Sequence, residues 1–240
     1  MNRHENKKYI LNKINQAAVT DKPWRHLIIH DFLPEDLYNG IKNETSEYLK
    51  RKELIGTENK GIRAYHINVN SSVGVMPRKD QEYLIEYYSL LQDYEIESAI
   101  KEKVNTVHHS NKKSVDMWSS FDIQSSGFVY DEVHCDHPLK TLTMLLYLAD
   151  VGDDLNLGTM LYTPEKLGRN LSVEKDYLER ADFLPNLALF FAPCDIKGSI
   201  TNHSMMHLSK ITDFRKSIQT FWLREKVNWT KPQKGRIELK

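Results

Sequence analysis

The apolar residues in the first half of the chain recur mainly at helical spacing. Residues 80–105 repeat apolar side chains at intervals of three and four, which predicts a long amphipathic helix. Pro34 and the acidic residues after it begin a second predicted helix, which runs to about Lys52. Residues 1–20 are polar and predict either a helix or a mobile arm. The first half is therefore expected to supply helices that support a sheet.

Short apolar and β-branched runs dominate the second half and predict strands. Runs of this length and composition are typical of strands buried in a sheet. The predicted strands are residues 118–130, 140–149, 158–162, 186–192 and 215–223, and two more precede them at residues 24–33 and 64–69. Many short strands separated by turn residues favour two packed antiparallel sheets.

Three potential metal ligands and one arginine lie at the ends of the predicted strands. His134 and Asp136 form a His-x-Asp pair, His203 lies 67 residues after Asp136, and Arg215 lies 12 residues after His203. Two imidazoles and a carboxylate make a facial triad, which holds Fe(II) and leaves coordination positions open. A guanidinium in the same pocket can bind a carboxylate through two parallel hydrogen bonds. These residues indicate an iron enzyme that binds a dicarboxylate cosubstrate and activates oxygen.

The two-residue period of a strand places these side chains on common faces. His134 and Asp136 are expected to point inward together. Arg215 and Ser217 likewise share one face, so both can hold the same anion. Gln124, on the strand before the His-x-Asp pair, is a candidate to line the same pocket, although ordinary packing explains it equally well.

The order and spacing of these segments resemble the Fe(II)- and 2-oxoglutarate-dependent dioxygenases, in the prolyl-hydroxylase-like branch. The resemblance covers about residues 118–223. In that family the His-x-Asp pair is followed by a strand similar to residues 141–148, and the distal histidine by small and apolar residues, as in His203-Ser204-Met205-Met206. An arginine or lysine that pairs with the distal carboxylate of 2-oxoglutarate follows, with serine two positions later, and Arg215-Lys216-Ser217 fits this pattern.

This resemblance implies a fold, a set of site residues and a reaction. The fold would be mainly β (α+β), a double-stranded β-helix or cupin-like jelly roll with flanking N-terminal helices. The implied residues are His134, Asp136 and His203 as catalytic metal ligands, and Arg215, Ser217 and Tyr130 as cosubstrate-binding residues. The implied cofactors are Fe(II), 2-oxoglutarate and O₂, with ascorbate as a further candidate. The reaction would hydroxylate an unactivated C–H bond and release succinate and CO₂.

Two positions depart from the family pattern, and neither is a proposed ligand. The family often has two glycines before the strand at 158–162, where this chain has Leu157-Gly158. The glycine expected near the start of residues 185–190 is Asn186, which also tolerates turn conformations. Asp136 stands where related halogenases have glycine or alanine, so the resemblance favours hydroxylation over halogenation.

Each candidate residue also has a purely structural explanation. A histidine at a strand end is often only hydrogen-bonded, Asp136 could open a turn, and Arg215 could be an exposed charge on an edge strand. His207 competes with His203 for the role of third ligand. Tyr130 could pack in the core rather than line the pocket.

Charge and composition exclude several classes of function. The chain has 33 basic and 33 acidic side chains, so no basic surface predicts a nucleic-acid partner. No run approaches the roughly 18 apolar residues of a membrane span, and the polar N-terminus lacks the apolar core of a secretory signal. Cys135 and Cys194 make no disulfide framework. The expected location is the reducing cytoplasm, which also suits Fe(II).

The whole chain, residues 1–240, is expected to form one oxygenase domain. An N-terminal strand and helices (1–117) would support the core (118–223), and a polar tail (224–240) would follow. Within the core, residues 164–183 are either a lid or an inert surface loop.

Three alternatives to the oxygenase interpretation stay open: a metal enzyme on the same barrel that uses no keto acid, a zinc hydrolase, and a non-catalytic jelly-roll binding protein. Keto-acid dependence separates the first two from an oxygenase, and metal binding separates the third. The expected partner is a small-molecule or peptide substrate, with no nucleic acid and no membrane.

Overall fold

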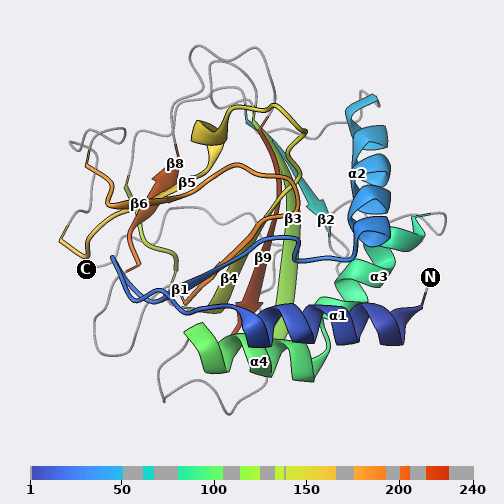
Figure 1. The fold of residues 1–240 in the computed structure, drawn as a ribbon, viewed down its shortest axis with the longest axis horizontal. Coiled ribbons are helices and arrows are strands. Elements are labelled where there is room, and N and C mark those ends of the chain that lie inside the picture. Colours follow the sequence, from blue (N-terminus) through green and yellow to red (C-terminus); the bar gives the residue numbers. More distant parts are fainter. Residues whose placement is uncertain are drawn as a thin grey trace.

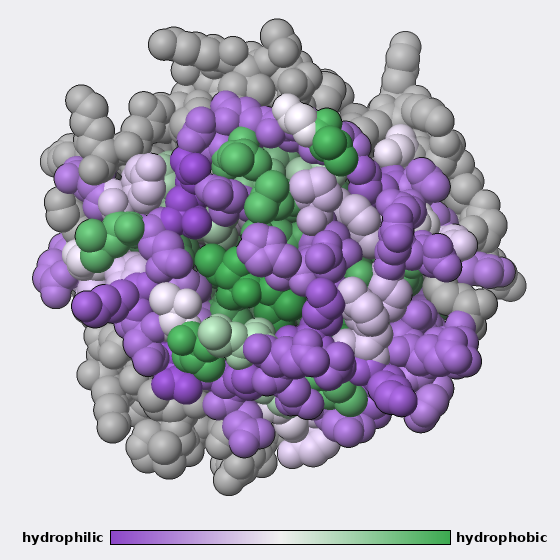
Figure 2. Space-filling model, viewed as in Figure 1, coloured by the Kyte–Doolittle hydropathy of each residue, from purple (hydrophilic) through white to green (hydrophobic). Residues whose placement is uncertain are grey.

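The structure is a computed structural model that describes residues 2–50, 62–67, 81–104, 114–124, 133–137, 139–165, 176–192, 201–205 and 215–226. Across these ranges two antiparallel sheets form the core, and four helices pack beside the larger sheet (Figure 1). The described part of the same face is mostly hydrophilic, with hydrophobic residues gathered near its centre (Figure 2). No helix in the described ranges is long and apolar enough to cross a membrane. The predicted double-stranded β-helix with N-terminal helices is confirmed.

Within the described residues the larger sheet has six strands in the order β1-β7-β4-β9-β3-β2, and each neighbouring pair is antiparallel. The strands are β1 (His26–Ile29), β2 (Ile62–Ile67), β3 (Asp116–Gln124), β4 (Lys140–Tyr147), β7 (Ala188–Phe191) and β9 (Arg215–Leu223). The last predicted strand, residues 215–223, matches β9 at both ends. β9 lies between β4 and β3, so it is not an edge strand.

The smaller sheet has the order β6-β5-β8 in the described residues. Its strands are β5 (Thr159–Leu161), which follows a short 3₁₀ turn (Leu155–Leu157), β6 (Glu179–Ala181) and β8 (His203–Met205). An isolated antiparallel bridge adds His134 beside His203. The chain passes back and forth between the two sheets, which lie side by side in Figure 1.

Four helices, α1 (Arg3–Gln16), α2 (Glu35–Lys50), α3 (Glu82–Leu91) and α4 (Tyr94–Val104), gather beside the larger sheet (Figure 1). They share one hydrophobic core with the alternate residues of β3, β4 and β9 that point toward them. Its members on these three strands are Met117, Phe121, Ile123, Leu142, Met144, Leu146, Ile218 and Trp222. Burying a large apolar side chain contributes about 1.5–3 kcal/mol, so this face of the sheet is the main source of stability.

The single helix predicted over residues 80–105 is wrong, because the chain forms α3 and α4 with a break between them. At the break, the Asp93 backbone N–H donates to the Leu90 carbonyl at 3.0 Å, which tightens the turn. The Asp93 side chain then accepts a hydrogen bond from the Glu95 N–H at 3.0 Å, as a helix N-cap does. Both helices bury apolar residues in the same core. The helical spacing of apolar residues in the sequence therefore continues across the break, and the spacing does not reveal where one helix ends.

The predicted insertion at residues 164–183 belongs in part to the smaller sheet. Residues 179–181 form β6, which pairs with β5 from Thr159 to Leu161. A Cβ on Gly158 would lie 1.9 Å from the Ala181 carbonyl oxygen, so only glycine permits this close approach. Residues 166–175 lie outside the described residues, and a lid there stays a prediction.

Asn186 occupies the turn that leads into β7. Its φ of 55° is in the left-handed region, which asparagine tolerates better than most residues. The Asn186 side-chain oxygen accepts from the Leu33 N–H at 3.0 Å, and its amide donates to the Leu33 carbonyl at 2.8 Å. Asparagine therefore provides here both the turn conformation and a link to the chain after β1.

Candidate metal centre and cosubstrate pocket

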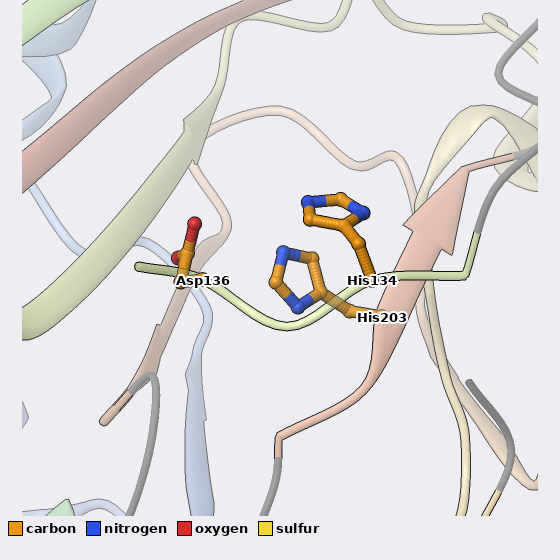
Figure 3. Close-up of side chains that lie close together, drawn as sticks. All are labelled: His134, Asp136 and His203. Atoms are coloured by element: carbon orange, nitrogen blue, oxygen red, sulfur yellow. The ribbon is translucent and has the colours of Figure 1, made fainter. Parts of the chain in front are cut away.

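His134, Asp136 and His203 lie together in the structure (Figure 3). One potential ligand atom from each lies within 4.8 Å of the other two. The imidazole centroids of the two histidines are 4.3 Å apart, with their planes at 53°. The three residues singled out from the sequence therefore form a cluster that could hold one metal ion.

Backbone pairing fixes the two histidines relative to each other. The His134 N–H donates to the His203 carbonyl at 3.1 Å, and the His203 N–H donates to the His134 carbonyl at 2.9 Å. Asp136 lies two residues after His134 in a stretch without regular secondary structure, and one of its carboxylate oxygens lies close to both histidines (Figure 3). The two histidines are thus paired at the edge of the smaller sheet.

His203 is held in the form that binds metals. Its Nδ1 lies 2.9 Å from the Thr201 carbonyl oxygen, which places the proton on Nδ1 and the lone pair on Nε2. Burial lowers the pKa of His203, although the carboxylate of Asp136 acts in the opposite direction. A neutral imidazole is the required ligand form.

Asp136 is ionised although only 8% of its surface is exposed. Burial alone would raise its pKa, but the ammonium of Lys140 and the two nearby histidines together hold the pKa of this carboxyl below its usual value. The Thr143 hydroxyl donates to Oδ2 at 2.7 Å, and Lys140 Nζ pairs with Oδ1. A carboxylate has about four acceptor sites, so Asp136 can bind a metal and keep one of these partners.

The donor set fits a divalent transition metal with open positions. Two imidazole nitrogens and one carboxylate oxygen are the ligands of the facial-triad iron sites, and zinc and nickel accept the same atoms. Among the described residues, no other group of three histidine, cysteine or acidic side chains has this spacing.

A cavity of about 260 Å³ joins the triad to Arg215. Its wall combines one face of the larger sheet with residues of the smaller one. Besides the triad, the lining residues are Asp122, Gln124, Thr143, Leu145, Thr159, Ser204, Met205, Arg215, Gln219 and Phe221. The pocket position considered for Gln124 is therefore the one observed.

Arg215 is 2% exposed and lies at the buried side of this cavity. Its Nε donates to the Leu157 carbonyl at 2.6 Å, and its Nη1 donates to Gln124 Oε1 at 2.7 Å and lies 3.3 Å from Ser217 Oγ. No carboxylate of a described residue makes an ion pair with this guanidinium. A buried cation costs several kcal/mol unless it is paired, so the position is suited to an anionic ligand. The alternative of an exposed edge-strand arginine is wrong.

Two residues that the sequence did not indicate surround the Arg215 guanidinium. The Tyr147 hydroxyl donates to Thr159 Oγ1 at 2.7 Å, and Thr159 Oγ1 lies 3.4 Å from Arg215 Nη2. The Arg215 guanidinium also lies 5.4 Å from the Tyr147 ring centroid. Tyr147 and Thr159 come from different sheets, so no local pattern could have brought them together.

Asp122 is a further acidic residue of the cavity that the sequence interpretation missed. It is 8% exposed, and burial raises the pKa of its carboxyl to about 6. Strand alternation could have found it, because Asp122 lies two residues before Gln124 on β3. Tyr130 and His207, in contrast, lie outside the described residues, so their predicted roles stay predictions.

No family model matches the sequence, and no curated protein matches it. Among solved structures, a prolyl-4-hydroxylase from Pseudomonas putida is similar with a TM-score of 0.56 and 12% identity, over 91% of this chain and 99% of that one. The dioxygenase for auxin oxidation 1 from Arabidopsis thaliana, in complex with 2-oxoglutarate, is similar with a TM-score of 0.55 and 14% identity, over 93% of this chain and 89% of that one. HygX from Streptomyces hygroscopicus, with nickel and 2-oxoglutarate bound, is similar with a TM-score of 0.54 and 12% identity, over 93% of this chain and 87% of that one.

These likenesses span nine-tenths of the chain, and at such low identity they establish the fold alone. Prolyl hydroxylases and other 2-oxoglutarate dioxygenases share it. The chain therefore has the fold of the 2-oxoglutarate dioxygenases, and within that fold it brings together a His-x-Asp…His cluster.

Proposed function

We propose that the chain is an Fe(II)- and 2-oxoglutarate-dependent dioxygenase that hydroxylates an unactivated C–H bond of a small molecule or a protein side chain, with release of succinate and CO₂. One observation carries the proposal. The three-ligand cluster and a buried arginine that no described carboxylate pairs with line the same cavity. A metal site and an anion site joined in this way suit a cosubstrate that has a chelating end and a carboxylate end.

Each residue of the candidate site has a defined role in this proposal. His134, Asp136 and His203 hold the iron, which when bound supplies oxygen activation coupled to oxidation of the keto acid. Arg215 binds the far carboxylate as a planar fork, and the Ser217 hydroxyl, 3.3 Å from Nη1, is placed to donate a further hydrogen bond.

Several surroundings of the site support this assignment. The Leu145 and Phe221 side chains give the cavity an apolar wall, which strengthens polar interactions inside it. Ascorbate is proposed as a reductant for the iron, and the cytoplasm as the location. Cys135, beside the ligands, forms no disulfide in the described residues, which suits a reducing compartment.

A zinc hydrolase is the second candidate, because two imidazoles and a carboxylate also bind zinc. Its chemistry needs a metal-bound water but no buried arginine at the far side of the cavity. The position of Arg215 therefore favours the oxygenase.

An anaerobic titration tests the proposal. The purified protein would be mixed with Fe(II) and then with 2-oxoglutarate, and the visible metal-to-ligand charge-transfer band of the chelated keto acid would be recorded. We expect a band that is lost in His134→Ala and weakened in Arg215→Ala. Arg25→Ala is the matched control, since Arg25 pairs with Asp21 away from the cavity. No band in the wild-type protein, together with tightly bound zinc, would sink the oxygenase assignment and favour the hydrolase.

A further inference from the structure

Lys140 places a second cation beside the candidate metal ligands. Its Nζ makes an ion pair with Asp136 Oδ1, and its side chain is 17% exposed. The ammonium also lies 3.4 Å from the centroid of the Phe221 ring, which stacks on Trp118 at 5.2 Å with the planes 10° apart. A carboxylate and an aromatic face together hold this ammonium at the candidate metal centre.

The ammonium and a metal ion would share one carboxylate. Asp136 Oδ2 already accepts a hydrogen bond from Thr143, while Oδ1 accepts from Lys140. Two cations beside one carboxylate repel each other, and in a partly buried site this repulsion is screened far less than in water. Lys140 is therefore positioned to oppose the binding of a divalent cation.

A second carboxylate on the same wall offers the ammonium another partner. Asp122 lines the same cavity as Asp136, and the charge of Lys140 acts to lower the pKa of the Asp122 carboxyl, against the effect of burial. The flexible four-carbon stem of lysine lets its ammonium move between neighbouring acceptors. The described part of the cavity wall thus contains two carboxylates, Asp136 and Asp122, and Lys140 is paired with the first of them.

We propose that Lys140 is a positioning residue that sets the metal affinity of the site. In the metal-free protein its ammonium holds Asp136 in place and neutralises it, and metal binding displaces the ammonium toward Asp122. The inference rests on the proposed function and adds how the metal occupancy of that site is regulated. The site fills only when the supply of metal overcomes this internal counter-ion, and loss of the metal returns the pocket to a charge-balanced state.

Calorimetric titration with Ni(II), in the absence of any keto acid, tests the first half of the proposal. Nickel resists air oxidation, and it is the metal in the similar HygX structure. Lys140→Met removes the charge, Lys140→Arg keeps it, and Lys42→Met removes a lysine that pairs with Asp150 away from the cavity. We expect Lys140→Met to bind Ni(II) at least about tenfold more tightly than wild type, with the other two close to wild type.

Unchanged or weaker Ni(II) binding by Lys140→Met would overturn the inference while leaving the proposed function intact. Weaker binding would mean that Lys140 merely supports Asp136, as residues around metal ligands often do. If neither wild type nor the variant takes up Ni(II), the metal site itself is refuted, and the inference with it. Lys140→Gln is a second neutral variant should the methionine protein not fold, as judged by its circular dichroism and thermal unfolding.

A double-mutant cycle tests the displacement toward Asp122. Asp122→Asn is expected to weaken Ni(II) binding in the wild-type background, where the displaced ammonium loses its second partner. The same change should have a clearly smaller effect in the Lys140→Met background. Equal effects in the two backgrounds would contradict the displacement, because Asp122 would then act on the metal without Lys140.

Discussion

The two faces of the larger sheet are made by the same strands and differ in almost every property. Toward the helices, β3, β4 and β9 present side chains such as Phe121, Met144 and Trp222, which pack in the main hydrophobic core. Toward the smaller sheet, the alternate positions of the same strands include Thr143, Arg215 and other polar residues that line the cavity. A two-residue period therefore separates the part that stabilises the fold from the part suited to bind a ligand.

Burial does not distinguish the two faces. Ser217 is 0% exposed and Arg215 is 2% exposed, as deeply buried as Phe121 at 0%. The Arg215 guanidinium is hydrogen-bonded, but its buried charge has no ion-pair partner among the described residues, so this position lowers the stability that the helix face provides. The comparison predicts that substitutions on the two faces have opposite consequences.

The largest effect is expected on the helix face. Phe121→Ala leaves a cavity in the main core and should lower the free energy of unfolding by about 3–5 kcal/mol. Urea denaturation measures this loss, and Ni(II) binding by the folded protein should change little, because Phe121 points away from the triad. A loss below about 1 kcal/mol would contradict the role assigned to this face.

Arg215→Met on the cavity face should show the reverse. We expect at least about a hundredfold weaker 2-oxoglutarate binding to the metal-loaded protein, or roughly 3 kcal/mol, because a charge-assisted fork is lost. Stability in urea should be unchanged or higher, since a buried charge has been removed. Arg215→Lys, which keeps the charge without the fork, should lie between the two. Equal 2-oxoglutarate affinity for all three proteins would refute the anion site.

Asp122→Asn tests whether a buried carboxylate on the cavity face lowers the free energy of unfolding in a pH-dependent way. Burial raises the pKa of Asp122 to about 6, above its value in an unfolded chain, so folding favours the protonated form. That contribution is present below about pH 4 and is lost as the pH rises through 6. The asparagine variant should therefore match wild type near pH 4 and exceed it by up to about 3 kcal/mol at pH 8. A stability difference in urea that does not vary with pH would contradict this assignment.

Ser217→Ala should have the smallest effect of the four. Loss of one hydroxyl donor to the far carboxylate is expected to weaken 2-oxoglutarate binding about five- to tenfold, or roughly 1 kcal/mol. The same titration calorimetry as for Arg215→Met measures it. An effect as large as that of Arg215→Met would mean that the hydroxyl, rather than the guanidinium, anchors the carboxylate.

Strand alternation predicted much of this division from the sequence. Residues 215–223 form β9 as predicted, and Arg215 and Ser217 share the cavity face. The His-x-Asp pair and the distal histidine could be connected because the order and spacing of all the segments, from residue 118 to residue 223, resemble a known family. The break between α3 and α4 could not be predicted from spacing, since both helices face one core, although Asp93 is a recognisable N-cap.

The rest of the site depends on contacts that no local pattern encodes. Tyr147 of the larger sheet meets Thr159 of the smaller one, and Arg215 contacts the carbonyl of Leu157. Asp122 could be placed on the correct face by counting, but its raised pKa arises from enclosure by other elements. The alternation of side chains along one strand can be predicted from the sequence, whereas the approach of separate strands is set by the packing of the whole core.

A crystal structure of the protein with Ni(II), which does not support turnover, and 2-oxoglutarate would show whether the triad and Arg215 form one site for the metal and the cosubstrate. We expect one metal ion bound by His134, Asp136 and His203, with the keto-acid end of 2-oxoglutarate on the metal and its far carboxylate on Arg215. We also expect that the Lys140 ammonium has moved away from Asp136. A metal ion held elsewhere, or 2-oxoglutarate bound without contact to Arg215, would contradict the account.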